Sequence, residues 1–243
     1  VTGGAKRIGA AIARAFGAAG WHVIIHYGRS RAQAKALAAE LPSAEIVGCD
    51  LDDWRAGPEM IRTLASRLED WRVLINCAGV FDFDSAQDLQ PAMFETAMRV
   101  NAGTPARLAQ TFLAHARSPQ GRRLIHVTDQ KLLNPNPDFF SYTMSKHALA
   151  ATVPMLSMTR PDPRDRIYGL APGAILASHD QTEAETEISH RMNLLHRKAT
   201  PQDIAGAALF LAQGWLASGE TVYVDSGQHL LAQERDVLFL ARQ

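Results

Sequence analysis

The sequence predicts a single-domain α/β fold in which a doubly wound parallel sheet is covered by helices on both faces. Short apolar runs recur at regular intervals, and helix-like stretches lie between them. This alternation is typical of parallel strands joined by right-handed crossovers. The 243 residues, 47% of them hydrophobic, are enough to bury one sizeable core.

The first half of the chain shows three steps of helix and strand. Ile8, Ile12 and Phe16 repeat at helical spacing, and Gly20 is typical of the end of a helix. The elements that we expect next are a strand at 23–25, a helix at 31–40, a strand at 45–48, a helix at 58–69 and a strand at 73–75. Because only Val1 and Thr2 precede the glycine turn, we expect the first strand to be truncated at the N-terminus.

The second half continues the alternation. The pattern predicts helical structure at 91–116, a strand at 124–127, a helix at 141–158, a strand at 167–170, a helix at 201–211 and a strand at 221–224. Residues 175–192 show no clear periodicity, so they are either a lid over the site or a solvated charged loop. The apolar tail at 237–240 packs either on another subunit or on its own core.

The composition narrows the class of partner. Lys plus Arg and Asp plus Glu both number 25, which gives no charge excess for nucleic acid or an anionic membrane. No apolar run reaches the roughly 18 residues that span a bilayer. Cys49 and Cys77 are too few for a disulfide framework and lack zinc-type spacing. We therefore expect a cytoplasmic protein with a small-molecule substrate and no metal.

A glycine-rich turn, Thr2 to Gly9, opens the first helix. Glycines at such a position let backbone N–H groups approach a pyrophosphate at the positive end of the helix. An ordinary turn has the same composition, so the motif alone leaves both interpretations open.

The segment after the strand at 23–25 indicates which nucleotide would bind. His26 to Ser30 contains no Asp or Glu to accept hydrogen bonds from a free ribose hydroxyl, which favours NADP(H) over NAD(H). Arg7 and Arg29 can both point at a 2′-phosphate. The alternative is that both are ordinary surface arginines.

Tyr142 and Lys146 lie one helical turn apart on the same face of the predicted helix. A lysine ammonium beside a tyrosine favours the phenolate, so the spacing predicts that Lys146 lowers the pKa of Tyr142 towards neutrality. A tyrosine with such a pKa can serve as a general acid.

These motifs resemble the short-chain dehydrogenases/reductases in order and spacing. The resemblance covers nearly the whole chain and rests on Thr2 to Gly9, Asn76-Cys77-Ala78-Gly79, Asn101, Tyr142 with Lys146, and Pro172-Gly173. It implies a Rossmann-type fold, a homotetramer, and proton donation by Tyr142, with Lys146 on the nicotinamide ribose and Asn101 supporting Lys146 through water. It also implies an NADPH site formed by Gly3, Lys6, Arg7, Ile8, Tyr27, Arg29, Ser30, Asp50, Leu51, Asn76, Ala78, Gly79, Tyr142, Lys146, Pro172 and Gly173.

Departures from the common family pattern narrow the resemblance to pteridine reductases and dihydromonapterin reductases. Asp129 stands where most members carry serine, Arg7 replaces the middle glycine of the turn, and Phe81 follows the Asn-x-Ala-Gly segment. The resemblance implies reduction of a dihydropterin, with Asp129 assisting Tyr142 and Phe81 stacking on the flat ring; whether dihydrofolate is also a substrate stays open. A simpler interpretation makes Phe81 loop packing and Asp129 a neutral change in a degenerate enzyme.

Two other functions remain open at this stage. One is an NADPH-dependent carbonyl or 3-oxoacyl reductase that happens to carry Asp129. The other is a non-catalytic NADP(H)-binding protein, although the intact set of Tyr142, Lys146 and Asn101 argues against it.

Overall fold

The computed structural model describes residues 1–177 and 181–243. In chain order the elements are α1 (Arg7–Ala18), β1 (Val23–Tyr27), α2 (Arg31–Glu40), β2 (Ala44–Gly48), α3 (Ala56–Ala65), β3 (Val73–Asn76), α4 (Pro91–Ala97), the π-helix η1 (Met98–Gly103), α5 (Thr104–His115), β4 (Arg123–Val127), the 3-10 helix η2 (Gln130–Leu132), α6 (Phe140–Met158), β5 (Arg166–Pro172), α7 (Glu183–Ser189), α8 (Pro201–Gln213), β6 (Thr221–Val224), the 3-10 helix η3 (Gln228–Leu230) and α9 (Val237–Leu240).

All strand pairs are parallel, as the alternation predicts, but they form two ladders. β1 pairs with β2, and a second ladder has the order β3-β4-β5-β6. Val1 and Thr2 connect the ladders at one end, because the amide of His26 donates to the carbonyl of Val1 and the amide of Thr2 donates to the carbonyl of Ile75. A cavity of about 510 Å³ lies beside these residues, between β1 and β3.

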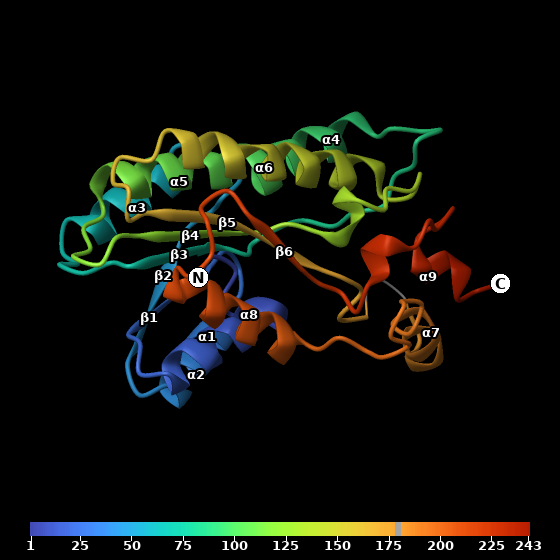
Figure 1. Ribbon diagram of the computed structural model, residues 1–243, viewed down its shortest axis with the longest axis horizontal. Coiled ribbons are helices and arrows are strands. Elements are labelled where there is room, and N and C mark those ends of the chain that lie inside the picture. Colours follow the sequence, from blue (N-terminus) through green and yellow to red (C-terminus); the bar gives the residue numbers. More distant parts are fainter. Residues whose placement is uncertain (178–180) are drawn as a thin grey trace.

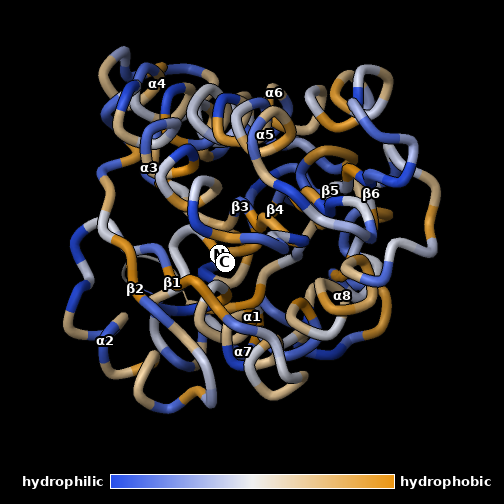
Figure 2. The backbone as a smooth tube through the Cα atoms, turned by 90° about the vertical axis from the view of Figure 1, so that its left-hand side faces the viewer, coloured by the Kyte–Doolittle hydropathy of each residue, from blue (hydrophilic) through white to orange (hydrophobic). Residues whose placement is uncertain are grey.

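Helices cover both faces of the strand layer (Figure 1). α3, α4, α5 and α6 lie on one side, and α1, α2 and α8 lie on the other. Each side has its own apolar core: Ile12, Phe16 and Ile204 belong to one cluster, whereas Leu108 and Phe112 belong to the other. Figure 2 shows hydrophobic stretches along β1 and β2. β1 is mostly buried, whereas β2 is only partly buried.

The expected helix at 91–116 is interrupted in its middle. Pro91 to His115 is helical throughout, but Met98–Gly103 forms a π-helix between α4 and α5. A π-turn adds a residue to the helical repeat and turns the side chains of its segment to a new direction. Such turns occur often at functional sites, and Asn101 lies inside this one.

The segment at 175–192 contains a short helix. The sequence did not predict this helix, because the segment shows no clear periodicity. α7 begins with a capping box, in which Thr182 accepts from the amide of Glu185 while the Glu185 side chain accepts from the amide of Thr182. The carboxylate of Glu185 also accepts from Arg242 in the tail. Residues 178–180 of the expected lid lie outside the described residues.

The C-terminal tail packs on its own chain, which answers one question that the sequence left open. Val237 and Leu238 are buried, and Phe239 packs against Phe83 and Phe139. α7 and α9 lie together at the end of the molecule where β5 and β6 finish (Figure 1). Among the described residues, no helix is long and apolar enough to cross a membrane.

Candidate active site

A cavity of about 440 Å³ lies at the carboxyl ends of the strands. In doubly wound sheets this is the usual place for a ligand. One end of the cavity is lined by the glycine turn and the residues after β3 and β5, and the other by residues after β4, on α6, around α7 and in the tail. Of the predicted site residues, the lining includes Gly3, Lys6, Arg7, Ile8, Ala78, Gly79, Phe81, Asp129, Tyr142, Lys146, Pro172 and Gly173.

The glycine turn packs closely on the segment after β3. Gly3 has a φ of +61°, and a Cβ there would lie 2.9 Å from the Cα of Ala78. A Cβ on Gly9 would overlap the carbonyl oxygen of Gly3. The side chain of Thr2 accepts from the amides of Cys77 and Ala78, which ties the two segments together. This leaves a narrow backbone-lined cradle of the kind that suits a dinucleotide pyrophosphate.

His26 of β1 is hydrogen-bonded to this turn. Its Nδ1 accepts from the amide of Gly3 at 3.1 Å, and its Nε2 lies 3.0 Å from the carbonyl of Cys49. An imidazole that accepts at Nδ1 and donates at Nε2 is neutral. Desolvation accordingly lowers the pKa of His26 to about 4.

Asp129 and Tyr142 form the chemical centre of the cavity. The hydroxyl of Tyr142 donates to Oδ2 of Asp129 at 2.6 Å, and the amide of Lys131 donates to Oδ1 at 2.9 Å. Asp129 follows β4 and Tyr142 lies in the first turn of α6, so the pairing joins the sheet to the helix layer. The pair can hold a proton between a phenol and a carboxylate.

The pKa of Tyr142 is raised, not lowered, which corrects the expectation from the sequence. Desolvation is the largest cause, followed by the negative charge of Asp129 and its hydrogen bond. Lys146 does not reverse this, because its ammonium lies 5.6 Å from the ring centre of Tyr142 and donates to the carbonyl of Val127. Desolvation also raises the pKa of Asp129 and lowers that of Lys146. Tyr142 is therefore protonated at neutral pH.

Asn101 holds the segment that carries Gly79 and Val80. Its Oδ1 accepts from the amide of Val80 at 2.8 Å, and its Nδ2 donates to the carbonyl of Val80 and to Oγ of Ser145. A Cβ on Gly79 would lie 3.1 Å from Oδ1 of Asn101 and 3.9 Å from Nζ of Lys146. The fully buried amide thus links α6 to the cavity wall.

Aromatic rings form the wall next to Tyr142. Phe81 stacks on Phe139 with centroids 4.1 Å apart, and its ring meets Tyr142 edge-on at 4.6 Å. Phe139 is fully buried and has a φ of +53°, a strained value for a bulky side chain. Such a wall suits a flat, partly apolar ligand.

Several predicted cofactor residues lie outside the cavity lining, namely Tyr27, Arg29, Ser30, Asp50, Leu51 and Asn76. Arg29 is exposed after β1, and Asp50 accepts from the amide of Asp52 in the turn after β2. Asn76 is buried between the carbonyl of Pro105 and Nδ1 of His126. Arg7 donates to the carbonyl of Ala177, after β5, so its side chain borders the cavity end near α7.

The lining also contains polar residues that sequence reasoning missed. They include Lys131, His190, Gln228 and Asp236. Lys131 follows the recognisable Asp129 by two residues, and that proximity is the one signal the sequence offered. The described residues contain no group of three or more His, Cys, Asp or Glu side chains that could hold a metal ion.

Known proteins resemble this chain along most of its length. A family model described as enoyl-(acyl carrier protein) reductase matches residues 3–229. A versicolorin reductase of Emericella nidulans is 27% identical over 248 residues, which cover 93% of this chain and 93% of that protein.

Two solved structures with bound NADP have a similar fold. The alternative dihydrofolate reductase 1, FolM, of Brucella canis has a TM-score of 0.89 and 29% identity, covering 97% of this chain and 95% of that one. The angucycline C-6 ketoreductase LanV has a TM-score of 0.84 and 28% identity, covering 95% of each chain.

Proposed function

Because the chain belongs to the short-chain dehydrogenase/reductase family, we propose that it is an oxidoreductase that uses NADPH to reduce the ring of a dihydropteridine. The observation that carries this proposal is the hydrogen bond from Tyr142 to Asp129, next to the aromatic wall of Phe81. A serine at this position suits a carbonyl oxygen, whereas a carboxylate can share a proton with a ring nitrogen. The similarity to an alternative dihydrofolate reductase supports the same substrate class.

The cofactor is NADPH. The cradle of Gly3, Gly9 and Ala78 suits a pyrophosphate, and no acidic side chain follows β1 to select a free ribose hydroxyl. Similar structures contain NADP. When bound, the nicotinamide supplies the hydride, so the protein contributes position and proton control.

Tyr142 and Asp129 manage the proton in this proposal. The raised pKa of Tyr142 keeps its hydroxyl protonated, and the raised pKa of Asp129 lets the carboxyl group accept or pass on a proton as the ring nitrogen gains one. Lys146 binds the nicotinamide ribose with the N–H groups that Val127 leaves free. Asn101 positions the wall at Gly79 and Val80.

Phe81 orients the substrate by stacking. Phe139 stacks on the Phe81 ring and holds it beside Tyr142, so the pteridine packs against the aromatic wall next to the hydroxyl of Tyr142. Folate is proposed as a further substrate because its pterin ring offers the same flat surface.

A carbonyl reductase is the second candidate. Similarity to an angucycline C-6 ketoreductase favours it, because a ketoreductase acts on a carbonyl group. The carbonyl oxygen would then lie at the hydroxyl of Tyr142.

The deciding experiment follows NADPH oxidation with dihydrobiopterin, dihydromonapterin, dihydrofolate and a panel of simple ketones. Wild type is compared with Tyr142→Phe and Asp129→Ser. Turnover of a pterin that both substitutions abolish supports the pteridine assignment. Turnover of ketones alone, particularly if Asp129→Ser improves it, establishes the carbonyl reductase. NADPH binding without turnover of any substrate identifies a cofactor-binding protein.

We also propose that the protein works as a cytoplasmic homotetramer. Exposed apolar side chains on α6 and after α8, among them Met155, Met158 and Trp215, offer surfaces for subunit contact. Light scattering of the purified protein measures the assembly.

A further inference from the structure

Asp236 lines the same cavity as Asp129 and Tyr142, although it comes from the C-terminal segment between η3 and α9. Its charge is one of the influences that raise the pKa of Tyr142, after desolvation and Asp129. The carboxylate therefore lies within electrostatic reach of the proton donor. The proposed roles of Tyr142, Asp129 and Phe81 make no use of it.

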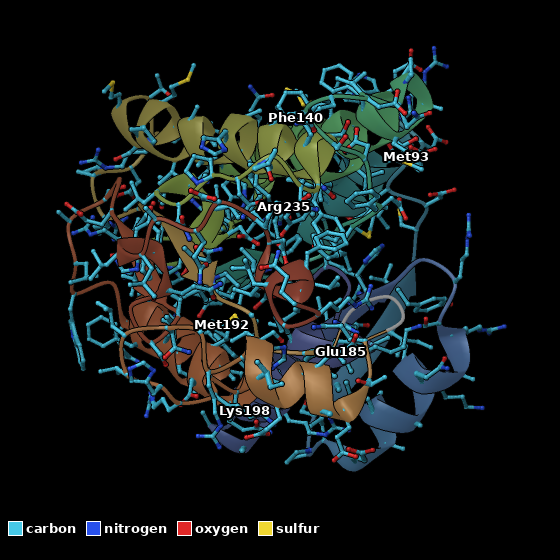
Figure 3. All side chains as sticks on the ribbon, turned by 90° about the vertical axis from the view of Figure 1, so that its right-hand side faces the viewer. Met93, Phe140, Glu185, Met192, Lys198 and Arg235 are labelled. Carbon is cyan, nitrogen blue, oxygen red and sulfur yellow. The ribbon has the colours of Figure 1, made fainter. Side chains whose placement is uncertain are left out.

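The segment around Asp236 is held firmly. The amide of Asp236 donates to Oδ2 of Asp138 at 2.8 Å, and Arg235 binds both oxygens of Asp138 at 2.8 and 2.9 Å. Figure 3 shows Arg235 in the middle of this face, between Phe140 of α6 and Glu185 of α7. Oδ1 of Asp236 accepts from the amide of Leu238 at 3.0 Å. These bonds fix the position of the carboxylate before any ligand arrives.

Lys131 supplies the counter-charge. Its buried ammonium lies 2.8 Å from Oδ2 of Asp236, 2.8 Å from Oδ1 of Asn136 and 3.2 Å from the carbonyl of Asp138. An ammonium has three N–H donors, so Lys131 has none left for a ligand. At the cavity, this ion pair holds the Asp236 carboxylate in place. A carboxylate has about four lone-pair sites, of which Asp236 uses two, so two remain for a ligand.

We propose that Asp236 is a specificity-determining residue that accepts hydrogen bonds from the amino edge of the substrate ring. The inference rests on the proposed pteridine reduction and names the part of the ring that is recognised. A 2-amino-4-oxopteridine carries neighbouring N–H donors on its amino group and ring nitrogen, and a fixed carboxylate matches two such donors. A steroid or polyketide ring has no such edge, so Asp236 selects against it.

The alternative to ligand recognition is a purely structural role for Asp236. Asp236 also caps α9 and neutralises Lys131, so its loss could loosen the segment. Asp138 provides the matched control, because it holds the same segment through Arg235 and the amide of Asp236 but does not line the cavity. A loosened segment predicts the same defect in both variants, whereas recognition by Asp236 predicts a defect in one.

The experiment measures kcat and KM for a dihydropterin and for the same ring without its amino group, in wild type, Asp236→Asn and Asp138→Asn. In Asp236→Asn, loss of a charge-assisted hydrogen bond raises KM for the aminated ring by about tenfold or more. The kcat of this variant, and its KM for the ring without the amino group, stay within about threefold of the wild-type values. Asp138→Asn leaves the ratio of the two KM values unchanged. Asp236→Ser, which keeps an oxygen to cap α9, is the second variant if Asp236→Asn unfolds.

Equal KM changes for the two rings, or the same selective change in Asp138→Asn, would overturn the inference. Binding of the two oxidised rings to the NADP⁺-loaded protein is measured in parallel. Suppose that wild type reduces neither ring but binds the aminated ring more tightly, and that Asp236→Asn loses this difference in affinity. The pteridine reductase assignment then fails, and the recognition by Asp236 stands. If wild type binds both rings equally or binds neither, recognition by Asp236 is wrong.

Discussion

The bond between Tyr142 and Asp129 gives the site its own pH dependence. Desolvation and then the charge of Asp129 raise the pKa of Tyr142, so the alkaline limb of wild-type activity lies well above neutral pH. Asp129→Asn removes the charge while keeping an acceptor for the hydroxyl. We expect its alkaline limb in kcat/KM to move to lower pH, measured with the best substrate over the alkaline range.

Tyr142→Phe is the reference for that profile. It removes the proposed proton donor but keeps the ring that Phe81 contacts, so we expect kcat to fall by at least about 100-fold. Its thermal midpoint and its affinity for NADPH should stay close to wild type. An alkaline limb that stays in place in Asp129→Asn would show that Asp129 does not control the protonation of Tyr142.

Arg7 is another residue whose backbone is informative. It has a φ of +53°, so the arginine adopts the left-handed conformation that glycine favours at the position where the family pattern has glycine. Alanine in this conformation costs about 1–2 kcal/mol, which exceeds the extra unfolded-state entropy of glycine. We expect Arg7→Gly to be at least as stable as Arg7→Ala in urea unfolding.

The same two substitutions at Arg14, in the same helix, serve as the control. Arg14 is an exposed residue of α1 whose ion pair with Glu40 is lost equally in both substitutions. There Arg14→Gly should be less stable than Arg14→Ala by about 1 kcal/mol, the usual order in a helix. The same order at Arg7 would argue against the left-handed backbone.

At the scale of elements, the N-terminus of α6 has no cap of its own. Phe139 occupies the cap position and offers no side-chain acceptor, so Asp84 of the loop after β3 accepts from the amide and hydroxyl of Ser141. The loop that carries Phe81 is thereby bound to the helix that carries Tyr142. Asp84 is thus a positioning residue for both.

Asp84→Ala should lower the free energy of unfolding by about 1–2 kcal/mol, as loss of a helix cap does. The same variant should raise KM for a ring substrate, because Phe81 and Tyr142 lose their common support. Asp82→Ala removes an exposed carboxylate of the same loop and should change neither quantity. Urea unfolding and steady-state kinetics measure both, and equal effects of the two variants would contradict the capping role.

Element boundaries could be predicted where one periodicity dominates. The strands at 73–75 and 124–127 and the helix at 141–158 follow directly from apolar spacing. The π-helix η1 was not predicted, since the apolar pattern at 91–116 was interpreted as one continuous helix. α7 was missed because its stability comes from a capping box and ion pairs instead of an apolar stripe.

For the molecule as a whole, contacts between neighbours in the sequence were easier to predict than contacts between distant segments. Tyr142 and Lys146 lie one turn apart, so their meeting follows from local geometry. Asp236 and Lys131 meet only because the tail folds back over the loop after β4. The direction of the Tyr142 pKa was predicted wrongly for a related reason, as desolvation is a property of the folded structure.

Buried neutral histidines should make the whole protein sensitive to mild acid. Desolvation lowers the pKa from 6.5 to about 3 for His126 on β4 and to about 4 for His26 on β1. Below pH 6.5 the unfolded chain binds protons at these rings while the folded chain does not, so stability falls as the pH falls. Each ring contributes up to about 1.4 kcal/mol per pH unit between its unfolded and folded pKa values.

His126→Leu separates this effect from the titration of other groups. Asn76 keeps its bond to the carbonyl of Pro105 in this variant, so only one partner is lost. Urea unfolding at about pH 7 and about pH 5 should show a smaller loss of stability for the variant, by roughly the contribution of one proton. Because the pKa of His26 is about 4, its hydrogen bond from the amide of Gly3 persists over this range, so NADPH affinity should stay nearly constant in both proteins. Parallel losses of stability in wild type and variant would mean that His126 is protonated in the folded protein.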